Sequence, residues 1–452
     1  MFHRIIISLI RVVANTFFRR IDVVGIANVP DEGPVIFAGN HPNALMDGFL
    51  LIAKCGRWPL HFMANAKLWN YRLLVPILSA TGAVPVFPRE EHGPAVDNSS
   101  AFKKLSEVIE RGNCMGIFPE GISHVESQLV KLKTGAARIA LSVTAHGKAD
   151  VVIVPCGLNY IHRHRFRSQV LIEFGSPIEI DDRWIQNYRD NEQETVRDLT
   201  ATLAEALRSV TLNAPDWSTL QFAQTSRRLY KPASAKLNPG DYFELSRRFV
   251  DRIVASSDDP ELLAFRKEVE DYQSRLELLG LKDHQLRNPI TAGYVLSKVI
   301  LRSLHMLVLL PLAIPGALLH LPVGWVAATV GERFSYEKDD VATLKVFATI
   351  LLLPVLYSII AVFVGINFGL WWAIAAMAAL TFSFFASVRL IEAEAGLLYS
   401  MLSLMRLARV GSDLDELRET RAQLVTKVRA LANRLADPDL PPMFTDEDFD
   451  QP

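Results

Sequence analysis

Short apolar runs alternate with helical patterns over residues 21–184 of this 452-residue chain. Four runs have the length and the β-branched composition of buried strands, and they read Val35-Ile-Phe-Ala, Gly82-Ala-Val-Pro-Val-Phe, Met115-Gly-Ile-Phe and Val151-Val-Ile-Val. Strands that alternate with helices are typical of an α/β architecture. We therefore predict that residues 21–184 form one α/β domain.

The chain beyond this domain is helical in pattern. Residues 185–300 are more polar, and prolines separate their segments, which predicts a helical extension. Residues 391–452 begin with a charged helical segment and end in a tail rich in Pro and Asp, from Asp437 to Pro452. Because such a tail buries little apolar surface, we expect it to be disordered.

Two apolar stretches predict a membrane anchor. Residues 346–366 and 368–388 are each 21 residues long and carry no charge, which suffices to span ~30 Å of hydrocarbon. Only Asn367 separates them, so we expect a tight transmembrane helical hairpin. Lys345 and Arg389 flank the same side of this hairpin, and the positive-inside rule then places both flanks, together with the α/β domain, in the cytoplasm.

An earlier apolar stretch, residues 304–330, is interrupted by three prolines and two histidines, namely Pro311, Pro315, Pro322, His305 and His320. Proline removes a backbone donor and kinks a helix. We expect a re-entrant or broken segment here rather than a straight span, within a membrane region of residues 301–390.

Polar residues recur at helical spacing through the otherwise apolar residues 1–20, at Arg4, Ser8, Arg11, Asn15 and Arg19. This pattern favours an interfacial amphipathic helix that lies on a membrane surface. Two alternatives stay open. One is a helix that packs on the core of the domain. The other is a signal peptide, although charges interrupt the apolar run and no small-residue cleavage site follows.

Charge and cysteine content exclude several classes of protein. The 48 Lys and Arg nearly balance the 49 Asp and Glu, so no overall field favours a nucleic acid partner. The three cysteines, Cys55, Cys114 and Cys156, have neither the even number of a disulfide framework nor the spacing of a zinc site. We therefore expect no bound metal and no nucleic acid partner.

His41 and Asp47 form the first candidate site, in the stretch Ala38-Gly-Asn-His-Pro-Asn-Ala-Leu-Met-Asp. An imidazole with a pKa of about 6.5 can act as a general base toward a hydroxyl group. A carboxylate on its other ring nitrogen fixes the tautomer. A histidine next to proline can equally brace a turn, so this pair alone does not identify a chemistry.

A second candidate site follows a later predicted strand. That strand leads into Phe118-Pro-Glu-Gly, and the basic stretch Lys131-Leu-Lys-Thr-Gly-Ala-Ala-Arg opens a helix. Backbone N–H groups at a helix N-terminus bind phosphate. Arg89 would add a guanidinium group that matches phosphate oxygens. The alternative for each of these bases is a solvated surface charge.

In order and spacing, the blocks around His41, Arg89, Phe118 to Gly121 and Val154-Pro-Cys resemble the four motifs of the glycerolipid acyltransferase family. Later segments look like fungal-type glycerol-3-phosphate and dihydroxyacetone-phosphate acyltransferases, namely Val210-Thr-Leu-Asn-Ala-Pro-Asp-Trp, Arg227-Arg-Leu-Tyr, Leu279-Gly-Leu-Lys-Asp-His-Gln and Lys338-Asp-Asp-Val-Ala-Thr-Leu-Lys. The resemblance covers about residues 21–390. It implies an α/β acyltransferase domain with a mixed sheet flanked by helices.

The resemblance also implies roles for individual residues. His41 would act as general base and Asp47 as the carboxylate that orients it. The residues that would shape the phosphate and acceptor pocket are Arg89, Glu120, Gly121 and Lys133.

The chain departs from the family pattern at three points. Five residues instead of four separate His41 from Asp47, Ile122-Ser123 stands where Thr-Arg is usual, and Lys133-Thr134 replaces a pair of lysines. In a helix of 3.6 residues per turn, the extra residue would rotate Asp47 by about 100 degrees. Contact between His41 and Asp47 would then require a turn that is not helical.

By this resemblance the chain is a membrane-bound O-acyltransferase of phospholipid biosynthesis. It would transfer a fatty acyl group from acyl-CoA or acyl carrier protein to glycerol-3-phosphate or dihydroxyacetone phosphate, with no further cofactor. We expect an integral membrane protein, in the inner or plasma membrane of a bacterium or in the endoplasmic reticulum of a eukaryote.

Three alternative functions follow from the same residues. The first is acylation of lysophosphatidate, which would use the same catalytic pair. The second is a catalytically inactive membrane scaffold, in which the altered spacing between His41 and Asp47 has abolished activity. The third, a transporter, is poorly supported because residues 346–366 and 368–388 contain no Asp, Glu, Lys, Arg or His.

Overall fold

The computed structural model describes residues 2–449 except 71–74, 88–96, 233, 288–291, 336–337, 339, 411–412, 439 and 445–447. The chain divides into two compact units. The first, which we call the α/β unit, comprises Met1–Leu220, Leu237–Val250 and Ser335–Thr343. The second, which we call the helical unit, comprises Gln221–Lys236, Asp251–Phe334 and Leu344–Pro452.

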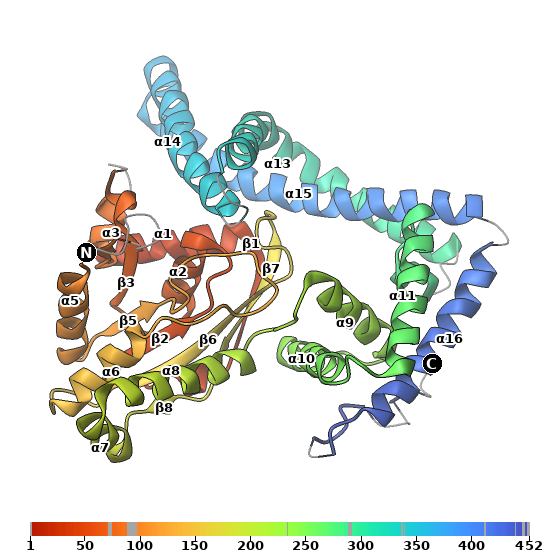
Figure 1. Ribbon diagram of the computed structural model, residues 1–452. Coiled ribbons are helices and arrows are strands. Elements are labelled where there is room, and N and C mark those ends of the chain that lie inside the picture. The colour runs from red at the N-terminus through yellow and green to blue at the C-terminus, as the bar shows by residue number, and fades with distance from the viewer. Residues whose placement is uncertain are drawn as a thin grey trace. The chain divides into compact units, whose positions relative to one another are not determined.

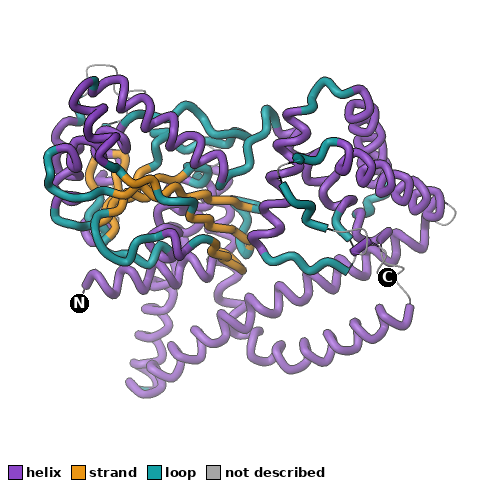
Figure 2. The backbone as a smooth tube through the Cα atoms, turned by 90° about the horizontal axis from the view of Figure 1, so that it is seen from below, coloured by secondary structure: helices purple, strands orange, loops and turns teal. Residues whose placement is uncertain are grey.

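Among the described residues, the strands all belong to the α/β unit. They are the orange segments of Figure 2. They are β1 (Phe18–Val24), β2 (Val35–Gly39), β3 (Leu60–Asn65), β4 (Val84–Val86), β5 (Cys114–Ile117), β6 (Val152–Tyr160), β7 (Ser168–Phe174) and β8 (Ile178–Glu179). The helices around them are α1 (Phe2–Phe17), η1 (Ile26–Asn28), α2 (Ala44–Lys54), η2 (Ala66–Asn70), α3 (Val75–Ala80), α5 (Ser99–Glu110), α6 (Gly135–Ala145), α7 (Asp182–Asp190) and α8 (Glu192–Ser209).

These strands form one mixed sheet with the order β1-β7-β6-β2-β5-β3-β4, and β8 pairs with β6 (Figure 1). Its centre is parallel, because β2 pairs in parallel with both β5 and β6. The pairs β6–β7 and β6–β8 are antiparallel. Strands β2 and β5 are buried along their whole length, which explains why they read as continuous apolar runs. The predicted α/β domain with a mixed sheet is confirmed.

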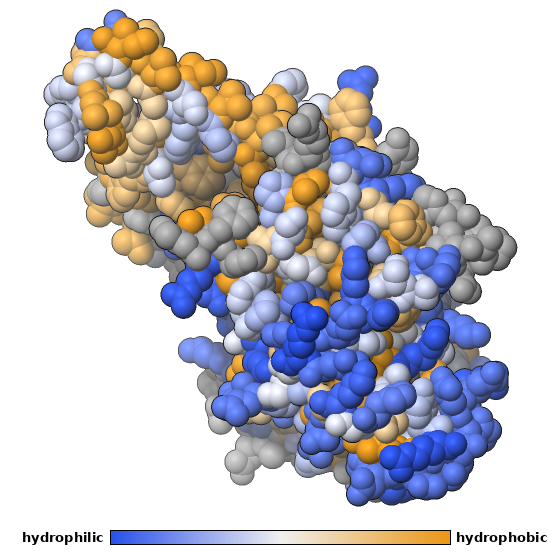
Figure 3. All heavy atoms as spheres, turned by 90° about the vertical axis from the view of Figure 1, so that its left-hand side faces the viewer, coloured by the Kyte–Doolittle hydropathy of each residue, from blue (hydrophilic) through white to orange (hydrophobic). Residues whose placement is uncertain are grey.

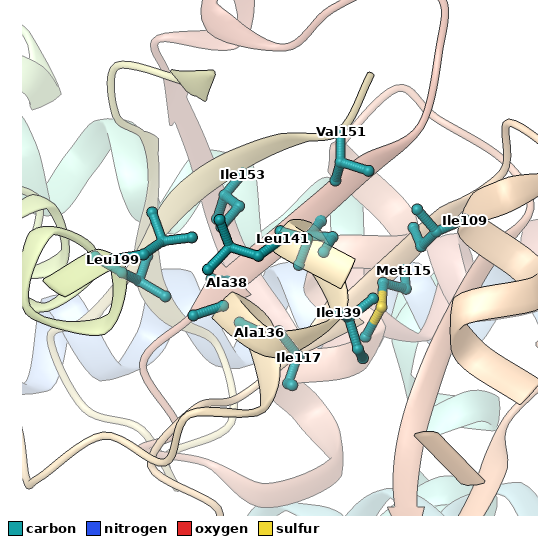
Figure 4. Packing of buried hydrophobic residues seen from close by; sticks show 14 of the residues in the cluster. Ala38, Ile109, Met115, Ile117, Ala136, Ile139, Leu141, Val151, Ile153 and Leu199 are labelled. Atoms are coloured by element: carbon teal, nitrogen blue, oxygen red, sulfur yellow. The ribbon is translucent and has the colours of Figure 1, made fainter. Parts of the chain in front are cut away.

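One part of the core of the α/β unit lies between the sheet and helices α5, α6 and α8. Side chains such as Met115 and Ile153 of the strands meet Leu141 of α6 and Leu199 of α8 in one cluster (Figure 4). Burying one such side chain stabilises the fold by about 1.5–3 kcal/mol. Because α8 contributes to this core, the unit continues past residue 184, where the sequence pattern placed its end.

Helix α1 packs against α2. One of its faces is buried, through Ile6, Ile7, Ile10, Ala14 and Phe17, whereas Ile5, Leu9 and Val12 are exposed. The buried face fits the core-packing alternative for residues 1–20. Contact of the exposed apolar face with a membrane stays a prediction.

The helical unit contains α11 (Pro260–Leu278), α12 (Asp283–Arg287), α13 (Ala292–Arg333), α15 (Leu370–Val410) and α16 (Asp413–Arg434). It also contains parts of α9 (Trp217–Tyr230), α10 (Pro239–Ala255) and α14 (Val341–Phe368). By length and composition, three helical segments of the described chain could cross a membrane: Leu309–Arg333, Val341–Phe368 and Leu370–Leu390. Apolar side chains gather at the top of Figure 3, where α14 lies.

The structure differs from the expected membrane region at two points. Helix α13 runs without interruption through Pro311, Pro315 and Pro322, so residues 304–330 are not a broken segment. Helix α14 continues through Asn367, and the break before α15 falls at Gly369, whose φ of +95° suits glycine.

Packing against α15 explains how α13 stays continuous at Pro315, one of its three prolines. The hydroxyl group of Ser383 accepts a hydrogen bond from the Gly316 N–H at 2.7 Å and donates one to the Leu312 carbonyl at 2.5 Å. Ser383 thus bridges two backbone groups that are four residues apart on α13, next to Pro315. A Cβ atom on Gly316 would lie within 2.6 Å of the Ser383 backbone, so only glycine permits this close approach.

Part of the C-terminal tail, which we expected to be disordered, is packed. Phe444 is buried and its ring lies 5.8 Å from that of Tyr230, measured between centroids. The ring of Phe449 lies 5.4 Å from Tyr230 and beneath the guanidinium group of Arg429. Two phenylalanines therefore supply apolar anchors that the average composition of the tail did not indicate.

Candidate active site

The candidate site lies where parallel strands end. His41 follows β2 by two residues, Glu120 follows β5 by three, and Tyr160 is the last residue of β6. Because β2 runs parallel to both β5 and β6, these three residues reach the same edge of the sheet. The carboxyl ends of parallel strands are where α/β proteins commonly bind ligands.

The structure brings His41 and Asp47 together. Nδ1 of His41 lies 2.9 Å from Oδ2 of Asp47, which also accepts a hydrogen bond from the Asn43 N–H at 2.7 Å. His41 precedes α2, whose first residue, Ala44, adopts a positive φ of +41°. The extra residue is therefore accommodated in a turn that is not helical, and the rotation expected for a continuous helix does not occur.

The carboxylate of Asp47 is fully buried and hydrogen-bonded on both oxygens. Its Oδ1 accepts a hydrogen bond from the phenol of Tyr160 at 2.5 Å. Burial raises the pKa of Asp47 above its ordinary value, while hydrogen bonds from His41, Tyr160 and Asn43 oppose that rise. Burial and the nearby Asp47 carboxylate raise the pKa of Tyr160, so the phenol remains a donor.

The imidazole of His41 is fixed in its plane by Phe118. The two rings are stacked, with centroids 4.0 Å apart and planes inclined by 4°. Gly39 makes room for Phe118, because a Cβ atom at position 39 would lie 3.2 Å from the phenyl ring. The side chain of His41 keeps 19 % of its surface exposed, whereas that of Asp47 is fully buried. The imidazole is therefore accessible while the carboxylate behind it is not.

Glu120 lies beneath the site rather than at its surface, since its side chain is fully buried. Oε1 accepts a hydrogen bond from the His41 N–H at 2.8 Å, and Oε2 accepts one from the Val130 N–H at 3.0 Å. Oε2 also pairs with the ring of His124. A direct contact of Glu120 with substrate, which the resemblance implied, stays a prediction.

Gly121 and Lys133 are neighbours in space. A Cβ atom on Gly121, whose φ is +76°, would lie 2.6 Å from Cδ, Cε and Nζ of Lys133. Lys133 is exposed and immediately precedes Thr134, the N-cap of α6, as the basic stretch predicted. An ammonium group thus lies beside a helix N-terminus, an arrangement that suits a phosphate. Arg89 falls outside the described residues.

The sequence did not indicate three residues of this site. They are Tyr160, His124 and Arg163. The guanidinium group of Arg163 lies close to the loop of His41, because it donates to the carbonyls of Pro42 and His124, each at 3.2 Å. The same group lies 5.5 Å from the ring centroid of Trp217. The contacts of Tyr160 and Arg163 join residues far apart in the chain, so no local pattern could reveal them, whereas His124 pairs with Glu120 only four residues away.

Two family models match this chain. Residues 20–159 match the model described as Acyltransferase, and residues 222–440 match the model described as Glycerol-3-phosphate acyltransferase 2 C-terminal domain. The first match contains the candidate site, apart from Tyr160 and Arg163. The second covers most of the helical unit.

Similar proteins carry names from the same group of enzymes. The chain is 31 % identical over 394 residues to glycerol-3-phosphate O-acyltransferase 2 of Saccharomyces cerevisiae, which covers 79 % of this chain and 52 % of the relative. It is 36 % identical over 260 residues to glycerol-3-phosphate O-acyltransferase 1 of the same yeast, with coverage of 56 % and 34 %. A shorter match, 25 % identical over 158 residues, joins it to the chloroplastic 1-acyl-sn-glycerol-3-phosphate acyltransferase of Arabidopsis thaliana. The chain thus spans about half the length of the first relative, or less for the other two.

Proposed function

Because the chain belongs to the glycerolipid acyltransferase family, we propose that it transfers a fatty acyl group from a thioester to a hydroxyl of glycerol-3-phosphate or dihydroxyacetone phosphate. The pairing of His41 with Asp47 at 2.9 Å carries this proposal, since it supplies a general base held in one tautomer. The names of the two yeast relatives and the match of residues 222–440 support this acceptor class.

In the proposed reaction, Nδ1–H of His41 donates to Asp47, so Nε2 is the basic nitrogen. Nε2 takes the proton of the acceptor hydroxyl as its oxygen attacks the thioester carbonyl. The carbon–sulfur bond then breaks, the thiolate leaves, and the imidazolium returns the proton to the sulfur. Asp47 stabilises the imidazolium between these steps. An ester and a free thiol result, and the enzyme returns to its starting state.

Phosphate anchoring would position the hydroxyl for this attack. Lys133 beside Gly121 at the start of α6 supports such a role, because a fixed positive charge holds the phosphate at one distance from the base. Arg89 and Gly121 complete the acceptor pocket in this proposal, and the buried Glu120 shapes it from beneath. The acyl donor is acyl-CoA or acyl carrier protein.

The inactive-scaffold alternative depended on the altered spacing between His41 and Asp47. Since the two side chains are in hydrogen-bonding contact, that reason for inactivity is absent. The alternative function, acylation of lysophosphatidate, is supported by the shorter and more distant match to the plant relative.

We propose an integral membrane location with the α/β unit in the cytoplasm. The α/β unit contains Ser335–Thr343 as well as Met1–Leu220 and Leu237–Val250. If this unit lies on one side of the membrane, the chain between Val250 and Ser335 crosses an even number of times. Among the described residues, Leu309–Arg333 is the one candidate span in that interval. Helix α13, which is uninterrupted, would then lie along the membrane surface instead of crossing the membrane, and α14 with α15 would form the anchor.

The test is an acyltransferase assay on membranes that contain the full-length chain. Labelled acyl-CoA and acyl carrier protein thioesters are offered with glycerol-3-phosphate, dihydroxyacetone phosphate or lysophosphatidate, and the lipid product is identified. His41→Ala removes the proposed base. His146→Ala is the matched control, because His146 is an exposed histidine at the opposite end of α6 from Lys133.

We expect product from glycerol-3-phosphate or dihydroxyacetone phosphate with the wild type and the control, and a loss of at least about 100-fold with His41→Ala. Product from lysophosphatidate alone would move the assignment to the second acylation step. An active His41→Ala variant, or a wild type that is inactive with every donor and acceptor pair, would contradict the proposal.

A further inference from the structure

A buried carboxylate ties together the loop of His41 and the segment that follows β5. Glu120 receives the N–H of His41 on Oε1 and the N–H of Val130 on Oε2. Two of the three donors are main-chain groups that belong to separate loops. The carboxylate therefore fixes the main chain of His41, and not only its side chain, relative to residues 120–130.

His124 supplies the third donor to this carboxylate. Its Nδ1 accepts a hydrogen bond from the Glu126 N–H at 3.2 Å, which leaves the ring proton on Nε2. Nε2 then donates to Oε2 of Glu120. Both ring nitrogens are thus engaged within the chain, so His124 has no nitrogen available to accept a proton from a substrate hydroxyl.

The backbone of His124 holds the main chain of His41 on the other side of its Cα atom. The His124 N–H donates to the carbonyl oxygen of His41 at 3.1 Å. The His124 carbonyl in turn accepts from Arg163 at 3.2 Å, and Arg163 also donates to the carbonyl of Pro42. Residue 124 therefore acts on both polar groups of His41, directly on the carbonyl and through Glu120 on the N–H.

We propose that His124 is a positioning residue for the acyl transfer proposed above: through Glu120 it fixes the main chain that carries His41. A small shift of a general base relative to its substrate lowers the rate more than it lowers binding. Loss of the His124 side chain should therefore reduce kcat and leave KM for the acceptor nearly unchanged.

Three substitutions separate the parts of this role. Gln at position 124 can place an amide donor near the position of the histidine Nε2 and so reach Glu120. Asn is shorter and can only replace the acceptor toward the Glu126 N–H. Ala removes both functions. His146→Ala again serves as the control for loss of an imidazole elsewhere.

We would measure kcat, KM and amide hydrogen exchange of residues 38–45 on the detergent-solubilised full chain. For His124→Ala and His124→Asn we expect kcat to fall by about 10-fold or more, KM for the acceptor to change by less than about 3-fold, and residues 38–45 to exchange faster. For His124→Gln we expect kcat within about 3-fold of the wild type and wild-type exchange. In a Glu120→Gln background, adding His124→Ala should have little further effect on kcat, because the two residues act in series.

Wild-type kcat and exchange in His124→Ala would overturn the proposal. So would a His124→Gln variant as inactive as His124→Ala, because the imidazole itself would then be required. If His124→Ala does not fold, the comparison of Gln with Asn decides by the same criteria. Hydrogen exchange does not depend on turnover. A wild type that acylates no acceptor would therefore refute the proposed function, while the exchange rates would still show whether His124 fixes the main chain of His41.

Discussion

Tyr160 donates a hydrogen bond to Oδ1 of Asp47 at 2.5 Å, while His41 lies 2.9 Å from Oδ2 of the same carboxylate. The tyrosine ends β6 and the histidine follows β2, so two neighbouring parallel strands hold one buried carboxylate between them. The orientation of His41 consequently depends on a residue that lies 113 positions away from Asp47.

Tyr160→Phe should therefore weaken catalysis without changing the shape of the core. Removing one donor to a buried carboxylate costs about 1–3 kcal/mol. We therefore expect the free energy of unfolding to fall by that amount and kcat to fall by roughly 10-fold. Tyr242→Phe, at an exposed tyrosine of α10, is the control. Equal kcat in both variants would show that Tyr160 does not help to orient Asp47.

Asp47→Asn should lower kcat and change how the free energy of unfolding depends on pH. An amide cannot hold the imidazole in the same tautomer, so we expect kcat to fall by roughly 10²–10⁴-fold. Because burial raises the pKa of Asp47, the folded state binds the carboxyl proton more tightly than the unfolded state does. We therefore compare the free energy of unfolding of the wild type with that of Asp47→Asn. The difference, wild type minus variant, should fall as the pH rises from 3.8 through the raised pKa of Asp47. Unfolding curves of both proteins between pH 4 and 8 measure this difference; a difference that grows with pH would contradict it.

Gly121→Ala tests whether Lys133 holds the phosphate. The new Cβ atom would lie 2.6 Å from the end of the lysine side chain and displace it. Gly112→Ala is the matched control, since Gly112 has nearly the same φ, +77°, with no atom within 4 Å of a Cβ. Both variants should lose about 1–2 kcal/mol of stability. Only Gly121→Ala should raise KM for the acceptor, by about 5-fold or more. An equal KM in both would remove Lys133 from the phosphate site.

Cys55 should be inert toward alkylation in the folded chain. Burial raises the pKa of its thiol to about 11, so only about 0.1 % is thiolate at pH 8. Iodoacetamide at pH 8 should modify Cys55 at least about 50-fold more slowly in the folded than in the urea-unfolded chain, as peptide mass spectrometry would show. The raised pKa also means that the free energy of unfolding falls as the pH rises from about 9 to about 11. Rapid modification of the folded chain would refute the burial of this thiol.

The proposed topology predicts which residues reagents reach from each side of the membrane. Single cysteines would replace the exposed residues Ser99, Leu301, Lys338 and Asn367. In sealed vesicles, an impermeant maleimide should label positions 99, 301 and 338 from the same side and position 367 from the opposite side. Labelling of positions 301 and 338 from opposite sides would show that α13 crosses the membrane.

The strands of the site could be predicted because parallel strands buried on both faces are uniformly apolar. The runs at residues 35–38 and 115–118 gave β2 and β5 within one residue of their observed bounds, and the run at 151–154 gave the start of β6, which continues to Tyr160. That pattern placed His41 at the end of a strand and the basic stretch at the start of α6. Contacts across the sheet, such as that of Tyr160 with Asp47, leave no periodic trace in the chain.

The break expected in residues 304–330 shows where prediction from local sequence fails. Proline alone argues for an interrupted helix, and that argument is sound for an isolated segment. Ser383, which lies 71 positions from Leu312, bridges the backbone next to Pro315 and removes the reason for a break at that proline. Whether a proline ends a helix therefore depends on a partner that local sequence does not identify.

The turn at Asn43 and Ala44 bears on how related chains should be recognised. A search that fixes the number of residues between a histidine and an acidic residue would pass over this chain, although its two side chains are in contact. What the chemistry needs is a carboxylate that reaches Nδ1, and one positive φ at Ala44 restores that reach after an insertion. Chains with other spacings therefore qualify when the inserted residue falls between the strand and the helix, because that is where the backbone can absorb it.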